Sequence, residues 1–123
     1  MKFLPACLLA LFISLAAPCR AAEEPLPPEQ AYPVSARSMG PAAVEVHIPI
    51  VKAYYLYKDK FRFRAEPESV RIGTPDLPPG KRKQDPYFGD VDVYRGDLTF
   101  TLPVEAPPGV HEFDLTVVSQ GCA

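Results

Sequence analysis

Lys60-Phe61-Arg62-Phe63-Arg64 alternates cationic and aromatic residues without interruption. Successive side chains of a β-strand point to opposite faces, so this stretch puts both phenylalanines on one face and the three cations on the other. An apolar face beside a charged face predicts a strand that is buried on one side only.

The same alternation recurs on both sides of this stretch. Upstream, Val44, Val46 and Ile48 alternate with polar residues, and Pro49 is expected to mark an edge or a bend. Downstream, strands are predicted at 70–72, 91–94, 98–102 and 110–118, and turns or loops at 66–68, 76–83, 95–97 and 107–109. No stretch of helical length has helical periodicity. The chain is therefore predicted to be all-β, an antiparallel β-sandwich.

The N-terminus has the features of a secretory signal peptide over residues 1–21. A short positive start, Met1-Lys2, precedes the apolar run 3–17, and the small residues Cys19 and Ala21 precede a cleavage point after Ala21. A retained membrane anchor is the alternative, but the apolar run is short for a membrane span. We therefore expect an exported chain whose mature part has no membrane span.

Residues 22–33 are rich in proline and glutamate. Such a composition disfavours a helix and offers little apolar surface to bury, so this segment is predicted to be an extended leader. The folded domain is then expected over 34–123.

The charge of the chain limits its partners. Loss of Lys2 and Arg20 with the signal leaves 11 basic against 15 acidic residues, a net charge of −4. This mild acidity argues against nucleic acid or an anionic membrane surface as a partner.

Counting cysteines gives the first indication of chemistry. Cys7 and Cys19 lie in the predicted signal, so the mature chain keeps only Cys122. Structural disulfides of exported proteins need cysteines in pairs, so a single one indicates intermolecular pairing or a reactive thiol. An incidental free thiol is the alternative.

Other signatures of enzymes are absent from the sequence. His47 and His111 fall on the polar phase of predicted strands, and no ligand cluster indicates a metal site, so no metal and no cofactor are expected. Arg95-Gly96-Asp97 spells a cell-adhesion tripeptide, but the same residues are ordinary hairpin-turn chemistry, which we favour.

Tyr87 and Phe88 form an aromatic pair between turn-forming residues. A thiol reacts as the thiolate, and it needs protection if it is to pass electrons selectively. An aromatic pair on a loop would supply such a lid. Packing within the loop or the core is the alternative interpretation of the pair.

Three motifs, in this order and spacing, extend the interpretation. They are Ala53-Tyr54-Tyr55-Leu56-Tyr57-Lys58, then Asp85-Pro86-Tyr87-Phe88-Gly89 with Val93-Tyr94-Arg95, and then Gln120-Gly121-Cys122-Ala123. Together they resemble the N-terminal periplasmic domain of the DsbD family of thiol:disulfide interchange proteins. The resemblance covers about residues 30–123.

The resemblance implies an immunoglobulin-like β-sandwich in the periplasm. Such a domain takes electrons from the thioredoxin-like C-terminal domain of the same protein. It passes them to thioredoxin-like partners, namely disulfide isomerases and cytochrome c maturation proteins. The reaction is thiol–disulfide exchange through a mixed disulfide, and it needs no cofactor beyond the cysteines.

The resemblance also implies roles for individual residues. Cys122 matches the first cysteine of the redox pair, and the segment Asp85, Pro86, Tyr87, Phe88 and Gly89 matches the cap loop, with Tyr87 at the shielding position. Tyr55 and Tyr57 match aromatics near the pair. Asp85 matches an acidic group whose charge disfavours a neighbouring thiolate.

This sequence also departs from the family pattern. In the family, Gly-Cys-Ala continues to a second cysteine within a Cys-Tyr-Pro-Pro run, and that segment is not in this sequence. We therefore expect the domain at 34–123 to be C-terminally incomplete and impaired as an electron carrier, so whether it acts as an enzyme stays open. The alternatives are a non-catalytic protein-binding sandwich and an inactive gene fragment.

Overall fold

The computed structural model describes residues 24–123, so the predicted signal peptide lies outside the described residues. Within them almost every regular element is a β-strand, and all paired strands are antiparallel. The predicted all-β class is confirmed. No helix in the described range is long and apolar enough to cross a membrane.

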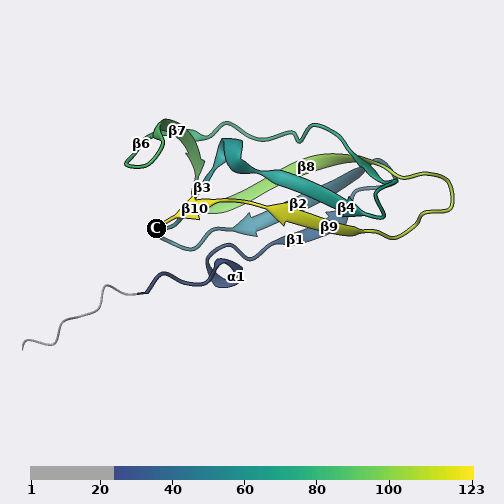
Figure 1. Ribbon diagram of the computed structural model, residues 1–123, viewed down its shortest axis with the longest axis horizontal. Helices are drawn as coiled ribbons and strands as arrows, with labels where there is room; N and C mark the ends of the chain where they lie inside the picture. The colour runs from purple at the N-terminus through teal and green to yellow at the C-terminus, as the bar shows by residue number, and fades with distance from the viewer. Residues whose placement is uncertain (1–23) are drawn as a thin grey trace, which may run out of the picture.

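The strands form two four-stranded sheets and one two-stranded sheet. The first sheet has the order β1 (Ser35–Ser38), β2 (Ala43–Pro49), β8 (Asp97–Glu105) and β5 (Arg71–Ile72). The second has the order β10 (Gly121–Cys122), β3 (Tyr55–Tyr57), β7 (Gly89–Tyr94) and β6 (Lys81–Asp85). The third pairs β4 (Arg62–Glu66) with β9 (Asp114–Val118). β2, β8, β4 and β9 run along the long axis, whereas β6, β7 and β10 lie at the end that carries the C-terminus (Figure 1).

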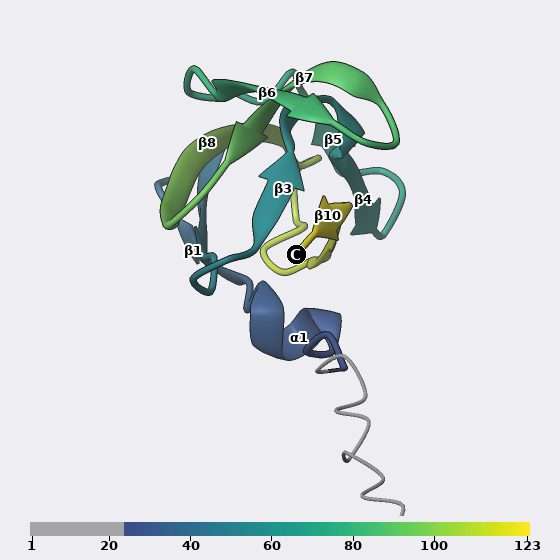
Figure 2. The ribbon, with the colours of Figure 1, turned by 90° about the vertical axis from the view of Figure 1, so that its left-hand side faces the viewer.

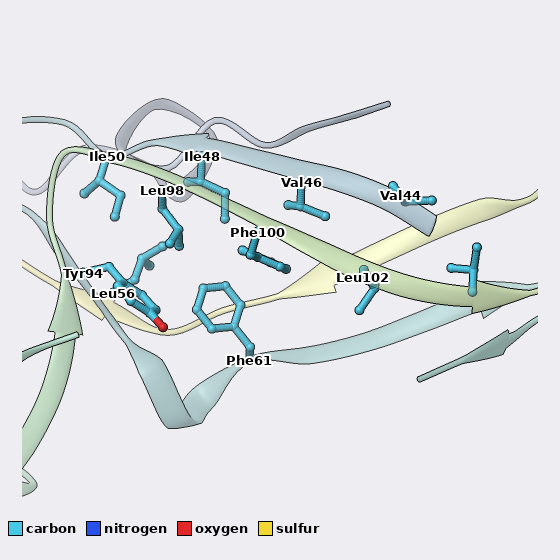
Figure 3. Packing of buried hydrophobic residues seen from close by; sticks show 11 residues of the cluster. Val44, Val46, Ile48, Ile50, Leu56, Phe61, Tyr94, Leu98, Phe100 and Leu102 are labelled. Atoms are coloured by element: carbon cyan, nitrogen blue, oxygen red, sulfur yellow. The ribbon is translucent and has the colours of Figure 1, made fainter. Parts of the chain in front are cut away.

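The main core lies between the first sheet and β4 with β9. Alternate residues of β2 and β8 are buried, and the two strands are in register with Val46 opposite Phe100. Phe61 packs against the Phe100 ring with centroids 5.6 Å apart and stacks with Phe63 at 6.1 Å, so both phenylalanines of the opening stretch face inward as predicted. The labelled side chains in Figure 3 show this packing; the fully buried large ones include Ile48, Leu56, Leu102 and Val46.

Several strand boundaries differ from the prediction. β6 begins at Lys81, inside the segment expected to be a loop, because it pairs with β7 from Val93 back to Gly89. β9 covers only Asp114–Val118 instead of 110–118. β8 continues through Pro103, whose carbonyl oxygen still accepts a hydrogen bond from the Gly73 N–H at 2.9 Å.

The segment expected to be an extended leader contains a short helix, α1 (Pro28–Ala31). Proline is tolerated at the first helical position, where its missing N–H has no intrahelical partner to lose. Ala31 is fully buried, and its carbonyl oxygen accepts a hydrogen bond from the Val51 N–H at 3.1 Å. The expectation of an extended segment with little to bury is therefore wrong for these residues. Figure 2 shows α1 beside the end of the sandwich that carries the C-terminus.

Candidate functional site

The site is built around β3, the central three-residue strand of the second sheet. β3 lies between β10 and β7, with Tyr55 opposite Cys122 and Tyr57 opposite Val93. The period of two sends Leu56 into the main core and sends Tyr55 and Tyr57 to the other face. A second, smaller core therefore forms on that face.

Cys122 belongs to this smaller core. It is half-buried, and it packs against the cluster of Tyr55, Tyr57, Val91 and Val93. It is the free cysteine of residues 24–123. The strand pairing thus brings the predicted thiol directly to the predicted aromatic residues.

Asp85 lies at the end of β6, where the chain turns toward β7, and its side chain joins the loop to β3. Its Oδ1 atom accepts hydrogen bonds from the hydroxyls of Tyr55 and Tyr57, each at 2.7 Å. Its Oδ2 atom accepts hydrogen bonds from the backbone N–H groups of Tyr87 at 2.8 Å and Phe88 at 2.9 Å. Although Asp85 is only 4 % exposed, all these donors satisfy its carboxylate.

These hydrogen bonds also set the charge state of the cluster. Burial by itself would raise the pKa of Asp85, but the donors from Tyr57, Tyr55, Tyr87 and Phe88 outweigh it and lower the pKa to about 2. Burial, with the hydrogen bond to Asp85, raises the pKa of Tyr57 to about 12 and also raises the pKa of Tyr55. At neutral pH the cluster therefore holds one carboxylate and two neutral phenols that donate to it.

The cap loop, residues 85–89, is a tight hairpin connection. Asp85 pairs with Gly89, whose φ of 73° is the left-handed conformation that glycine adopts without strain. Pro86 is exposed at the tip. The loop therefore has few conformations available while the hydrogen bonds to Asp85 are intact.

The two aromatic residues of the cap loop have different surroundings. Phe88 packs edge-on against the Tyr57 ring, with centroids 5.0 Å apart, and Tyr57 in turn packs edge-on against Tyr55 at 5.5 Å. Tyr87, at the position expected to be shielding, is 77 % exposed. Phe88 thus makes the aromatic contact between the loop and the smaller core.

Sequence reasoning missed Tyr32, which follows helix α1. Its hydroxyl donates to the carbonyl oxygens of Cys122 at 3.3 Å and Tyr55 at 3.4 Å. A Cβ atom at Gly121 would collide with the Tyr32 ring and with the Tyr55 carbonyl oxygen, so glycine is required there for close approach. Tyr32 stands in a proline-rich segment, and nothing in the local pattern indicated a distant contact.

Three cations that were not predicted to belong to the site surround these rings. The Lys60 Nζ atom lies 4.7 Å from the Phe88 ring centroid, and the Lys83 Nζ atom lies 5.1 Å from that of Tyr55. The Arg95 guanidinium carbon lies 4.8 Å from the same Tyr55 centroid. Arg95 begins the predicted turn, in which Gly96 has a φ of 70°. Its guanidinium nevertheless belongs to the surroundings of Tyr55.

One cleft among the described residues lies apart from this cluster. This cleft, of about 990 Å³, lies between β1 and the 106–115 segment, and none of the site residues named above lines it. Within 24–123, no three His, Cys, Asp or Glu side chains gather as a metal site would require. The site consists of a thiol, a buried carboxylate, phenols and surrounding cations.

Known proteins that are similar to this chain belong to one family. Residues 22–123 match the family described as thiol:disulfide interchange protein DsbD, N-terminal. A DsbD from Ralstonia nicotianae is 43 % identical over 117 residues, which are 94 % of this chain and 19 % of that protein. DsbD 1 from Pseudomonas aeruginosa is 35 % identical over 95 residues, which are 77 % of this chain and 16 % of that protein. The chain thus spans less than a fifth of the length of these relatives.

Solved structures are similar as well. The reduced N-terminal domain of Neisseria meningitidis DsbD superposes with a TM-score of 0.67 at 31 % identity, covering 80 % of this chain and 76 % of that one. A structure of the complex between the DsbD and PilB N-terminal domains from the same organism gives a TM-score of 0.60 at 28 % identity, covering 81 % and 76 %. The expected immunoglobulin-like β-sandwich is confirmed.

Proposed function

This chain belongs to the family of DsbD N-terminal domains, and from that premise we propose that it is a thiol–disulfide exchange module whose reacting group is Cys122. The observation that carries the proposal is the position of Cys122, which is half-buried against Tyr55 and Tyr57. The cap loop, which Asp85 joins to both tyrosines, packs on Tyr57 through Phe88.

The proposed reaction is a nucleophilic exchange. The Cys122 thiol loses its proton to solvent, and the thiolate sulfur attacks one sulfur of a partner's disulfide. A new sulfur–sulfur bond forms as the old one breaks, and the other partner sulfur leaves as a thiolate. That thiolate, attacking the Cys122–partner bond, reverses the step. No electrons are gained or lost overall, and no cofactor takes part.

We assign Asp85 the role of holding the cap loop, since both of its carboxylate oxygens are engaged by the loop and by β3. Its predicted effect on the protonation of the thiol is a second part of the proposal. A fixed negative charge disfavours another anion beside it. Comparing the pH dependence of Cys122 alkylation in the natural chain and in the Asp85→Asn variant tests that part.

We further propose that the module works in the periplasm, after removal of residues 1–21. Its electron donor would be a thioredoxin-like C-terminal domain of a DsbD-type protein, whose dithiol would reduce the Cys122–acceptor disulfide and become a disulfide itself, so that Cys122 and the acceptor are both released as thiols. Its acceptors would be thioredoxin-like disulfide isomerases and cytochrome c maturation proteins. The complex of a related DsbD N-terminal domain with the PilB N-terminal domain supports a protein as the partner.

Disulfide trapping tests the proposal. The partner is a thioredoxin-like domain in which one cysteine of the pair has been substituted. Its remaining cysteine is activated as a mixed disulfide with a small aromatic thiol. This chain should capture that domain as a covalent disulfide. Capture should disappear in Cys122→Ser. As a matched control, Cys122→Ser combined with Thr116→Cys moves the thiol to an exposed position of β9.

The outcomes separate exchange from simple binding. Faster capture through Cys122 than through the relocated thiol supports a built exchange site. Equal rates would mean that Cys122 is an ordinary thiol with no exchange site around it. A third outcome is that the natural chain captures no partner covalently, while Cys122→Ser still forms a non-covalent complex. That outcome would overturn the proposal and identify the chain as a protein-binding sandwich.

A further inference from the structure

Lys60, Lys83 and Arg95 come from three separate places in the chain and converge on the smaller core. Lys60 ends the short 3₁₀ helix η1 (Lys58–Lys60), Lys83 lies in β6, and Arg95 follows β7. Each places its cationic group over an aromatic ring of the site, at 4.7 to 5.1 Å from a centroid. We call these three residues the basic collar.

Among residues 24–123 no collar residue forms an ion pair with a carboxylate. The ion pairs found among residues 24–123 join Arg37 to Glu45, His47 to Asp97 and Arg82 to Asp92. None of them includes a collar residue. Three cations without an ion-pair partner in the described part of the chain stand out, because acidic residues outnumber basic ones in the sequence.

The collar also lies close to the reacting group. Lys83 and Arg95 contact the ring of Tyr55, and Tyr55 is the residue paired with Cys122 across β3 and β10. Lys60 contacts Phe88, which packs on Tyr57 of the same cluster. A protein that brings a disulfide to Cys122 therefore meets the collar.

The surface beside the collar suits a protein partner. Tyr87 is 77 % exposed and Phe88 is 43 % exposed, so two aromatic side chains accompany the three cations. Aromatic residues and arginine are enriched in protein–protein interfaces. The faces of the rings restrain the cationic groups by cation–π contact, which lowers the entropy lost when an anion binds to them.

We propose that the basic collar is a docking surface for a protein that carries acidic residues beside its own reactive disulfide. This inference rests on the proposed function and adds the charge of the partner to it. The attraction would steer the partner to Cys122 and orient its disulfide, chiefly by raising the association rate. It would weaken with salt, because exposed charges are screened beyond about 10 Å at 0.1 M ionic strength.

Two activated peptides test the inference. Each carries one cysteine as a mixed disulfide with 2-thiopyridine, and the peptides differ only in flanking glutamates or flanking lysines. The Cys122 thiolate attacks the peptide sulfur, a protein–peptide disulfide forms, and 2-thiopyridone leaves and is measured by its absorbance. At low salt the acidic peptide should react about tenfold faster than the basic one, the lower end of electrostatic rate enhancements.

Three variants separate the collar from general charge and from packing. Lys60→Gln/Lys83→Gln/Arg95→Gln should abolish the preference. The matched control, Arg37→Gln/Arg64→Gln/Arg71→Gln, changes the net charge by the same amount at positions outside the site. This control should keep most of the preference for the acidic peptide. The charge-conserving variant Lys60→Arg/Lys83→Arg/Arg95→Lys should retain the preference, which a merely structural role of these side chains does not require.

The results distinguish failure of the inference from failure of the proposed function. Equal rates for the two peptides with the natural chain would overturn the collar and leave the exchange chemistry standing. The collar would also be overturned if the Arg37, Arg64 and Arg71 control lost the preference for the acidic peptide as fully as the collar variant does. No reaction at Cys122 with either peptide, while a thiol moved to position 116 reacts, would overturn the proposed function itself.

Discussion

Tyr32 and Cys122 are 90 positions apart in the sequence, yet the Tyr32 hydroxyl donates a hydrogen bond to the Cys122 carbonyl oxygen at 3.3 Å. The contact fixes the backbone of β10 from the side of α1. Burial is the main cause that raises the pKa of Tyr32 to about 12, so its hydroxyl remains a donor across the physiological range. The segment before β1 is thereby part of the site.

We expect Gly121→Ala to destabilise the fold, because its Cβ would collide with the Tyr32 ring and the Tyr55 carbonyl oxygen. Overpacking of this kind typically costs about 1–3 kcal/mol of unfolding free energy, which urea denaturation would measure. On a Tyr32→Ala background the cost of Gly121→Ala should be smaller, since one of the two colliding groups is gone. Strictly additive effects of the two substitutions would contradict the contact.

Phe88→Ala should loosen the cap loop. It removes the edge-to-face contact with Tyr57 at 5.0 Å and the contact with Lys60. Alkylation of Cys122 by iodoacetamide should become faster, by about twofold to tenfold if one aromatic contact of roughly 0.5–1.5 kcal/mol is lost. The matched control is Tyr87→Ala, whose side chain is 77 % exposed. A larger acceleration in Tyr87→Ala would instead identify Tyr87 as the shielding residue.

Asp85 makes stability depend on acidity. Its pKa falls from 3.8 to about 2 on folding, so its contribution is complete above about pH 4 and is lost as the pH falls through 2. We expect the difference in unfolding free energy between the natural chain and Asp85→Asn to shrink on acidification across this window. Urea denaturation at several pH values measures it. A difference independent of pH in this range would mean that the carboxylate is not stabilised by folding.

Phe100→Ala tests the main core. Phe100 is buried beneath Phe61 and Phe63, and truncating a buried phenylalanine to alanine costs about 3–5 kcal/mol. Thr99→Ala, on the exposed face of the same strand, should change the unfolding free energy by no more than about 0.5 kcal/mol. Similar losses in both variants would argue against the alternation of β8.

Period-two patterns predicted the strands well where one face is buried and the other solvated. Phe61, Phe63 and the alternate residues of β2 and β8 lie as that pattern requires. β6 was missed because Lys81-Arg82-Lys83-Gln84 has no apolar face, and only its pairing with β7 makes it a strand. Helix α1 was missed because prolines flank it and a long-range backbone hydrogen bond holds it.

The sequence indicated which residues belong to the site better than it indicated the contacts between them. Cys122, Asp85, Tyr55 and Tyr57 were named in advance, and the structure brings them together. Tyr32 and the basic collar were not named, because their contacts depend on packing between distant segments that no local motif encodes. Phe88 rather than Tyr87 packs on the site because the two adjacent side chains of the turn point in different directions. No local motif encodes those directions either.

The carboxylate of Asp85 joins two parts of the molecule, the strand β3 and the tip of the cap loop. One oxygen is bound by the tyrosines of β3, and the other by the backbone of the loop tip. Release of the tip would break the second pair of hydrogen bonds and the Phe88–Tyr57 contact, whereas the first pair would keep Asp85 on β3, still ionised and hydrogen-bonded by two phenols. Because the first pair lies between β6 and β3, it would hold Asp85 in the position from which its other oxygen binds the tip.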